Sequence, residues 1–260
     1  MLLFNLRDPS GTGRPHSILG DRRVRRAITM AIDRHAVVES ALGLTARVAE
    51  GPLPRVLLDS LLLPDVPSDT AAAQRLLEAA GWLRDARDGV RRRNGHRLQL
   101  SLLIPAIGQQ LSIAVLLQAQ LRAVGIDLRI DESEFNTTVT RLAAGQFDAT
   151  LLDLNWDPSP ASVRQIWSTA SLSPRGSNFG GYSNSRFDTL LDSAVGAGDY
   201  RSARLLYRRA LSVLVGDAPA VWLYDVVNVG AVRKPVRPIG VRADAWWMDV
   251  GRWETTDAVR

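Results

Sequence analysis

Two short segments in the second half of the chain combine aromatic rings with small polar groups, a combination suited to binding a polar molecule. An aromatic ring offers an apolar face to a ligand side chain or sugar, a carboxylate can pair with a cation, and amides and hydroxyls exchange hydrogen bonds. Glycines in the second segment would let the backbone approach a ligand closely. The candidate ligand-binding residues are Asn155, Trp156, Asp157, Ser177, Asn178 and Tyr182.

Each candidate also has a structural interpretation. Trp156 can close the top of the core, and Asp157, which precedes Pro158, can cap a helix that starts near Ala161. The glycine loop over 176–184 can equally be an ordinary turn. The residue types alone leave both interpretations open.

Phe135 and Asn136 extend the candidate set, because they follow a predicted strand and could line the same cleft. Asn136 has a simpler interpretation as the N-cap of a helix predicted over 137–144.

Catalytic and metal-binding patterns are weak. The chain has no cysteine, and its three histidines, His16, His35 and His96, lack the spacing of a metal site. The segment 11–13 lacks the lysine of a phosphate loop, and there is no Gly-x-Ser-x-Gly elbow. The stretch 84–90 has some of the acidic character of a calcium loop but not its alternating ligands. We expect a binding protein without catalytic residues, metal or cofactor.

A β-α-β-α-β pattern must position the candidate residues. Such alternation predicts parallel strands joined by right-handed crossovers, and ligands on such sheets bind beyond the carboxyl ends of the strands. Asn155 directly follows the third strand, so the pattern itself predicts a site there. The predicted elements are strands over 97–104, 126–130 and 147–154 and helices over 111–124 and 137–144.

The remaining sequence predicts more helices and short strands around this core. Asn94-Gly95 favours a type I′ turn in a hairpin, and the prolines of 51–67 predict an irregular segment. The other predicted helices span 21–42, 68–81, 185–195 and 199–215. A further strand is predicted over 2–6, and strands or extended segments are predicted over 220–224 and 226–232.

Composition predicts a protein with a sizeable core, with 46% hydrophobic and 23% charged residues among 260. The net charge of +5 and the arginine clusters at 22–26 and 91–93 raise an alternative, a basic α/β domain that binds anions or nucleic acid. The clusters lack interleaved aromatic residues, so we favour solvated faces and expect no nucleic acid. The N-terminal apolar run is too short for a secretion signal, and no stretch approaches 18 apolar residues.

Four segments resemble one known family in order and spacing. They are L-L-F-N-L at 2–6, D-R-R-V-R-R-A-I-T-M-A-I-D-R-H-A-V-V at 21–38, A-A-A-Q-R-L-L-E-A-A-G-W at 71–82 and D-A-P-A-V-W-L-Y at 217–224. With the segment around Trp156, they resemble the family 5 extracellular solute-binding proteins, which are dipeptide, oligopeptide and nickel receptors of ABC importers.

The resemblance implies an α/β fold, a periplasmic-binding-protein-like (type II) lobe with a βαβαβ core. Family members are longer and place a secretion signal and a whole N-terminal lobe before the L-F-N segment, so we expect the C-terminal half of such a protein with the N-terminal lobe absent. The implied organisation is a crossover strand and loop over 1–20, a ligand-binding lobe over 21–225, and a segment over 226–260 that returns toward the other lobe. The tryptophans of that last segment are expected to be exposed, packed on one another or buried against another subunit.

By the same resemblance, the chain is a component or fragment of an ABC importer that binds peptides or similar polar small solutes for transmembrane transport. The implied partners are a ligand, a transporter permease, and the missing lobe or another subunit, and the implied location is the periplasm or cell envelope. In peptide receptors of the family an aspartate of this segment holds the α-amino group; counted from Pro158, its position falls on Leu154, with Asp153 one place earlier.

Overall fold

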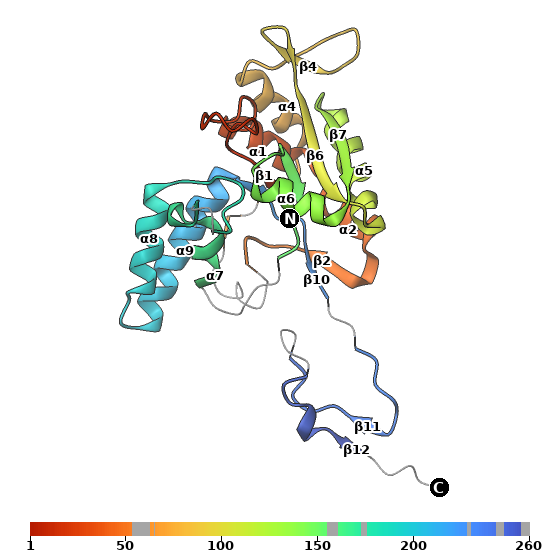
Figure 1. Cartoon of the computed structure of the whole chain (residues 1–260), viewed down its shortest axis with the longest axis vertical. Helices are drawn as coiled ribbons and strands as arrows, with labels where there is room; N and C mark the ends of the chain where they lie inside the picture. Colours follow the sequence, from red (N-terminus) through yellow and green to blue (C-terminus); the bar gives the residue numbers. More distant parts are fainter. Residues whose placement is uncertain are drawn as a thin grey trace.

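The body of the molecule is an α/β unit, and the C-terminal segment lies apart from it (Figure 1). The computed structural model describes residues 1–53, 63–64, 66–154, 161–172, 176–227, 230–242 and 247–255. In the body, helices cover both faces of a five-stranded sheet with the strand order β7-β6-β8-β1-β9. The five strands are β1 (Leu2–Phe4), β6 (Gln99–Pro105), β7 (Asp127–Ser133), β8 (Ala149–Leu151) and β9 (Ala220–Val221).

The central strand β6 runs parallel to both of its neighbours, β7 and β8. The helix α5 (Gly108–Ala123) connects β6 to β7, and α6 (Phe135–Ala143) connects β7 to β8. The predicted parallel β-α-β-α-β core is therefore confirmed. The strand β1 is inserted antiparallel between β8 and β9, so β9 points in the same direction as β8.

Both faces of the sheet are buried, and alternate residues of each strand divide between two cores. Leu2 and Phe4 of β1 pack into a core with α1, α4 and α5, while Leu3 points into a second core with α8 and α9. In β6, Leu102 and Leu103 divide between the two cores in the same way. This alternation follows from the two-residue repeat of a strand, and it explains why these strands are apolar at nearly every position.

The helix predicted over 21–42 is in fact two helices, α1 (Arg22–Ala31) and α2 (Arg34–Ala41). Ile32 between them is extended, and the Asp33 carboxylate accepts a hydrogen bond of 3.0 Å from the Ala36 N–H. Asp33 is thus the N-cap of a new helix. The apolar spacing of the segment continues across this break, which is why periodicity alone predicts one helix.

Of the segments predicted over 220–224 and 226–232, only 220–221 and 224–226 are strands, and the described residues at 227 and 230–232 are in none. Most other elements agree with the predictions, and Asn94 (φ 52°) and Gly95 (φ 80°) have the two positive φ angles that a type I′ turn requires. The remaining helices are α4 (Thr70–Ala79), α7 (Ala161–Trp167), α8 (Ser185–Val195) and α9 (Tyr200–Asp217), with short 3₁₀ turns at Gly43–Thr45, Thr169–Leu172 and Val250–Arg252. The remaining strands are β2 (Ala46–Val48), β3 (Leu83–Arg84), β4 (Arg91–Arg93), β5 (His96–Arg97), β10 (Tyr224–Val226), β11 (Val236–Arg237) and β12 (Glu254–Thr255).

A buried histidine fastens the loop after β1 to the sheet. Its Nδ1 accepts hydrogen bonds from the N–H groups of Ile18 (3.1 Å) and Leu19 (3.0 Å), so the proton lies on Nε2 of His16, 3.0 Å from Asp148 Oδ1. The other carboxylate oxygen of Asp148 accepts from the Ser101 N–H at 2.8 Å. One carboxylate thus joins the loop, β6 and the start of β8.

Substituting Asp148→Ala should lower the free energy of unfolding by about 2–4 kcal/mol, because it leaves the His16 Nε2–H and the Ser101 N–H without their acceptor. Asp148→Asn keeps one oxygen and should lose about half as much. Urea denaturation followed by far-UV circular dichroism measures both changes. An Asp148→Ala variant as stable as the wild type would show that the hydrogen bonds from His16 and Ser101 to Asp148 contribute nothing to stability.

Gly125 is expected to be intolerant of a side chain for two separable reasons. Its φ is +89°, and a Cβ would lie 2.8 Å from Arg91 Cγ and 3.0 Å from the Gly89 carbonyl oxygen. Gly145 has a similar φ of +69° with no atom near its would-be Cβ. Gly145→Ala should cost about 1–2 kcal/mol from backbone strain alone, and Gly125→Ala should cost clearly more in the same urea experiment. Equal losses of stability in the two variants would mean that Arg91 can move aside at no cost in free energy.

Candidate functional site

The carboxyl ends of β6, β7 and β8 lie at one edge of the sheet because these three strands are parallel. Pro105 and Ser133 are register partners at this edge, and the Ala106 N–H donates to the Ser133 carbonyl oxygen at 2.9 Å. The chain then leads into the first residues of α5 and α6. The residues that follow the three strands are therefore candidates for contact with a ligand.

Asp153, two residues beyond the end of β8, presents a carboxylate at this edge. Its Oδ1 accepts a hydrogen bond of 2.8 Å from the Tyr224 hydroxyl, and its Oδ2 lies 3.4 Å from Gln110 Nε2. Burial, and then the hydrogen bond to Asp153, raise the pKa of Tyr224 above its ordinary value. Three segments far apart in the sequence thus hold one exposed acidic group in place.

Beside Asp153 lies a second acceptor. Gln110 Oε1 is buried and has no hydrogen-bond partner within the part of the chain that the structure describes. A buried acceptor is normally hydrogen-bonded. The exposed carboxylate of Asp153 suits a ligand group that carries N–H donors, whereas Gln110 Oε1 has no surface open to a ligand in this structure.

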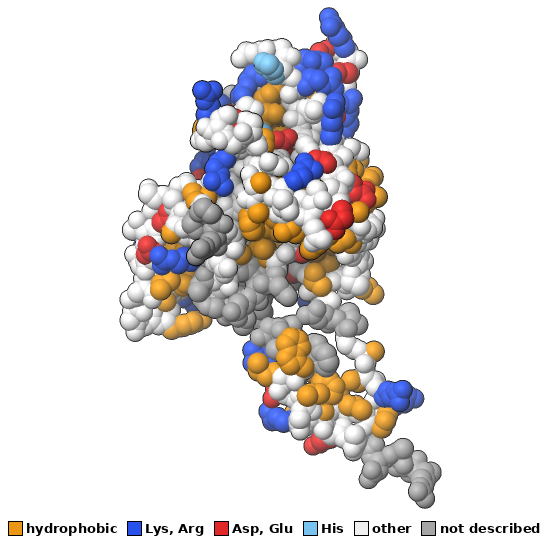
Figure 2. All heavy atoms as spheres, in the orientation of Figure 1, with side chains coloured by type: hydrophobic (Ala, Val, Ile, Leu, Met, Phe, Trp, Pro, Cys, Tyr) orange, Lys and Arg blue, Asp and Glu red, His pale blue; other side chains and the backbone are white. Residues whose placement is uncertain are grey.

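Apolar side chains extend the same edge. Ile107 is 48% exposed and Phe135 58% exposed at the starts of α5 and α6, and Leu111 and Val139 follow them one helical turn later. Figure 2 shows hydrophobic side chains gathered around α6 on this face. The edge therefore combines an acidic group with exposed apolar surface, an arrangement that can hold the polar and apolar parts of one small molecule.

Phe135 and Asn136 lie at this edge, as predicted, in the exposed first turn of α6. Asn136 is not the N-cap, however. The Glu134 side chain accepts from the Thr137 N–H at 3.1 Å, so the helix begins at Phe135 and the capping interpretation of Asn136 is wrong. The Asn136 side chain therefore does not cap α6.

The loop over 176–184 does not join this edge. The Gly180 carbonyl oxygen accepts from the Leu6 N–H at 2.8 Å, beyond the end of β1. Because β1 runs antiparallel to β8, that end lies at the amino edge of the parallel strands. The sequence could not reveal this separation, since it depends on the direction of β1.

Asn178 and Tyr182 of this loop are buried and fully engaged within the protein. Asn178 Nδ2 donates to the Ser168 and Tyr182 carbonyl oxygens at 3.0 and 2.8 Å, and the Tyr182 hydroxyl donates to Asp217 at 2.9 Å. The Ser177 hydroxyl lies 3.4 Å from Gln165 Nε2. A ligand-binding role for these three residues stays a prediction.

Asn155, Trp156 and Asp157 lie outside the described residues, so their binding roles also stay predictions. They follow Asp153 within four positions, and α7 begins at Ala161. The residues predicted from the sequence follow the same strand end as Asp153, which was not among the predicted binding residues. The missing signal was Tyr224, whose contact spans 71 positions.

The arginine cluster at 91–93 is engaged in internal contacts. Arg91 is buried and donates to the carbonyl oxygens of Val124 (2.8 Å) and Trp82 (2.9 Å), and the Arg93 guanidinium stacks over the Trp82 ring at 4.6 Å. In the cluster at 22–26, Arg25 is buried and donates to the Asp217 carbonyl oxygen at 2.6 Å. The cluster at 91–93 therefore does not form a free basic surface, and in the cluster at 22–26 the exposed Arg22 and Arg23 pair with Asp217 and Asp21. This pairing weakens the motive for the nucleic-acid alternative.

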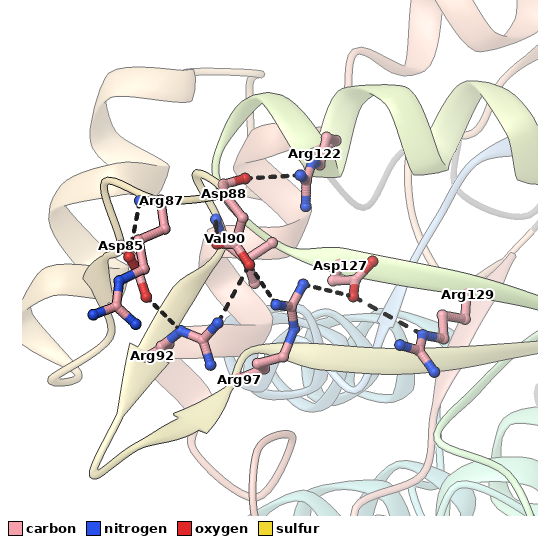
Figure 3. Close-up of polar contacts among 9 residues, drawn as sticks. All are labelled: Asp85, Arg87, Asp88, Val90, Arg92, Arg97, Arg122, Asp127 and Arg129. Atoms are coloured by element: carbon pink, nitrogen blue, oxygen red, sulfur yellow. Dashed lines mark hydrogen bonds and ion pairs between the residues drawn. The ribbon is translucent and has the colours of Figure 1, made fainter.

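The acidic stretch 84–90 is likewise paired with arginine rather than arranged for a cation (Figure 3). Asp85 Oδ2 lies 2.6 Å from Arg92 Nε, and Asp88 pairs with both Arg92 and Arg97. Arg97 also pairs with Asp127 at 3.3 Å, which ties the hairpin to β7. Backbone N–H groups and these arginines hold the pKa values of the Asp85 and Asp88 carboxyls below their usual range.

Within the described ranges, no three histidine or acidic side chains are grouped so that they could hold a metal ion. No helix in the described part of the chain has the length and apolar character needed to cross a membrane.

The sheet order and the parallel central strands define the fold of a type II periplasmic-binding-protein lobe. Residues 1–173 match the bacterial extracellular solute-binding proteins, family 5 (middle region), and the chain belongs to this family. The oligopeptide-binding protein AppA of Bacillus subtilis is 25% identical over 251 residues, which are 92% of this chain and 46% of AppA. Protein XP55 of Streptomyces lividans is 31% identical over 218 residues, 80% of this chain and 38% of XP55.

Solved structures show the same extent of similarity. AppA in complex with a nonapeptide matches with a TM-score of 0.81 and 20% identity, covering 98% of this chain and 50% of AppA. NikZ of Campylobacter jejuni in complex with Ni(L-His) matches with a TM-score of 0.80 and 22% identity, covering 98% of this chain and 51% of NikZ. The chain spans about half the length of these relatives.

The Tyr224–Asp153 contact should give stability a measurable alkaline dependence. A raised pKa in the folded state means that the unfolded chain loses the phenol proton first, near its ordinary value of 10.0, so stability is lost as the pH rises above that value. Tyr224→Phe should be less stable by about 1 kcal/mol at neutral pH because a hydrogen bond is lost, and this deficit should shrink by about pH 11. Urea denaturation midpoints of both proteins across this pH range measure the stability difference. A difference that stays constant with pH would argue against the Tyr224–Asp153 contact.

Proposed function

We propose that this chain contributes one wall of the ligand-binding cleft of an ABC-importer solute-binding protein, which binds peptides or similar polar small solutes for transmembrane transport. The observation that carries the proposal is the Asp153 carboxylate, held by Tyr224 and Gln110 at the carboxyl edge of the parallel strands. The family membership supports it, as do the names of relatives that bind oligopeptides, di- and tripeptides, glutathione and nickel.

In the proposed binding mode, a ligand ammonium group lies against Asp153, and an apolar ligand side chain covers Ile107 and Phe135. Charge pairing would fix the ligand's orientation, while the exposed apolar side chains would supply contact area. Asn136, and Asn155 to Asp157 close by in the sequence, would complete the polar lining. No bond is made or broken, so the protein is a receptor and not an enzyme, and it acts at the cell envelope with a permease as its partner.

We further propose that the chain is organised as residues 1–20, the lobe 21–225 and a return segment 226–260. The return segment lies apart from the body in Figure 1 and carries exposed apolar side chains, among them Val241 (59%), Trp247 (58%) and Met248 (61%). Such exposure fits a surface that is covered in the assembled protein. Closing a second lobe over the edge would then add the opposite wall.

The proposal predicts weak but specific peptide binding by this chain alone. One wall offers part of the contact area, so tripeptides with a free amino terminus and an apolar side chain should bind with a dissociation constant of about 1 mM, near 4 kcal/mol of binding free energy. N-acetylation of the same peptide removes the ammonium and should abolish binding. Ligand-detected NMR on the 260-residue chain suits this affinity.

A matched pair of variants assigns the binding to the proposed edge. Asp153→Asn should weaken binding by about tenfold, since a charge-assisted hydrogen bond contributes about 1.5 kcal/mol or more. Glu39→Gln removes the same charge from an exposed position on α2 and should leave binding unchanged. Free and acetylated peptides binding equally well, or the two variants behaving alike, would refute the assignment to Asp153.

A further inference from the structure

A second, chemically different site lies at the amino edge of the sheet. An open cavity of about 670 Å³ is formed by one face of α9 together with the first residues of α1 and α8. It lies beside the start of β9, which is parallel to β8, and so on the opposite edge from Asp153. The charged and polar side chains that line it include Arg22, Asn184, Arg186, Arg208, Arg209 and Asp217.

The cavity holds an uncompensated positive charge. Four guanidinium groups face one carboxylate, which leaves three positive charges in excess. The carboxylate of Asp217 is already engaged, because it accepts hydrogen bonds from the Tyr182 hydroxyl (2.9 Å) and Asn184 Nδ2 (2.7 Å) and pairs with Arg22 at 3.3 Å. It therefore has little capacity left to neutralise the other arginines.

The remaining three arginines are the groups available to an external ligand. Arg186, Arg208 and Arg209 are exposed, and their side chains form no hydrogen bond or ion pair with any residue that the structure describes. Like charges around one cavity repel one another, and an anion that binds between them removes this repulsion. The excess is local to α9, which has no acidic residue before Asp217 at its end.

Two helix N-termini also lie at the cavity, with Asp21 capping α1 and Asp188 in the first turn of α8. Asn184 is the N-cap of α8 and Arg22 is the first residue of α1, and both line the cavity. The N-terminus of a helix carries a partial positive charge that favours anions. Ser212, on the same face of α9, also lines the cavity, and its hydroxyl donates to the Arg208 carbonyl oxygen at 2.8 Å.

We propose that this cavity is a binding site for a phosphate group. A phosphate offers three or four oxygens in a tetrahedral arrangement, so it can accept hydrogen bonds from several guanidinium groups that approach from different sides. A carboxylate offers only two oxygens in one plane, and Asp217 already supplies one. The same chemistry is carried by a free phosphate and by the headgroup of an anionic lipid.

Binding of each source can be measured on the 260-residue chain. Inorganic phosphate is titrated by calorimetry with chloride exchanged to keep the ionic strength constant, and vesicles of phosphatidylglycerol are compared with vesicles of phosphatidylcholine by sedimentation. Saturable binding of inorganic phosphate identifies a site for the free group. Binding to phosphatidylglycerol vesicles alone identifies a lipid headgroup.

Paired variants then distinguish a site from general basicity. Arg208→Gln with Arg209→Gln should weaken binding by about tenfold or more, because each removes a charged donor. Arg26→Gln with Arg201→Gln removes the same charge from exposed residues outside the cavity and should change binding less than about twofold. Equal loss in both pairs, or no binding of either probe, would overturn the proposal. Neither outcome bears on the peptide-binding edge.

Discussion

The parallel placement of β6 between β7 and β8 is the constraint on which the rest of the structure depends. A parallel strand pair requires a crossover across a face of the sheet, so α5 and α6 must cover opposite faces and the strands must be apolar on both sides. The division of Leu102 and Leu103 between two cores is the direct result. The same geometry brings three strand ends to one edge, where the backbone must turn and side chains become free for other contacts.

The antiparallel strand β1, inserted between β8 and β9, is the second feature that shapes the sheet. β1 runs against its neighbours and places the loop that follows it at the amino edge, where the His16–Asp148 contact fastens it. The strands β1 (Leu2–Phe4) and β9 (Ala220–Val221), which are far apart in the sequence, are thereby paired in a single sheet. The two edges therefore differ in their composition: at one, apolar and acidic groups follow the parallel strands, and at the other, arginines from α1, α8 and α9 surround Asp217.

The sequence predicts what is local and misses what depends on long-range pairing. The β-α-β-α-β core, the Asn94-Gly95 turn and the helices α8 and α9 follow from apolar spacing and turn residues, and all are confirmed. The break at Asp33 was missed because the apolar spacing continues through Ile32 while a capping hydrogen bond decides the outcome. The position of the 176–184 loop was missed because it requires the direction of β1, and the Tyr224–Asp153 contact was missed because it joins β10 to the residues that follow β8.

Charge in this protein shows the same distinction between sequence and structure. The three adjacent arginines at 91–93 all make contacts within the protein. Arg91 is buried, Arg92 pairs with Asp85 and Asp88, and Arg93 stacks on Trp82. The arginines of α9 are spaced along a helix and attract less notice in the sequence, yet Arg208 and Arg209 share a cavity with the ends of two other helices. A cluster of like charges in a sequence therefore says little about surface potential, because neighbours in the chain can be paired individually. Charges that tertiary structure assembles without partners are the ones that an external ion can neutralise.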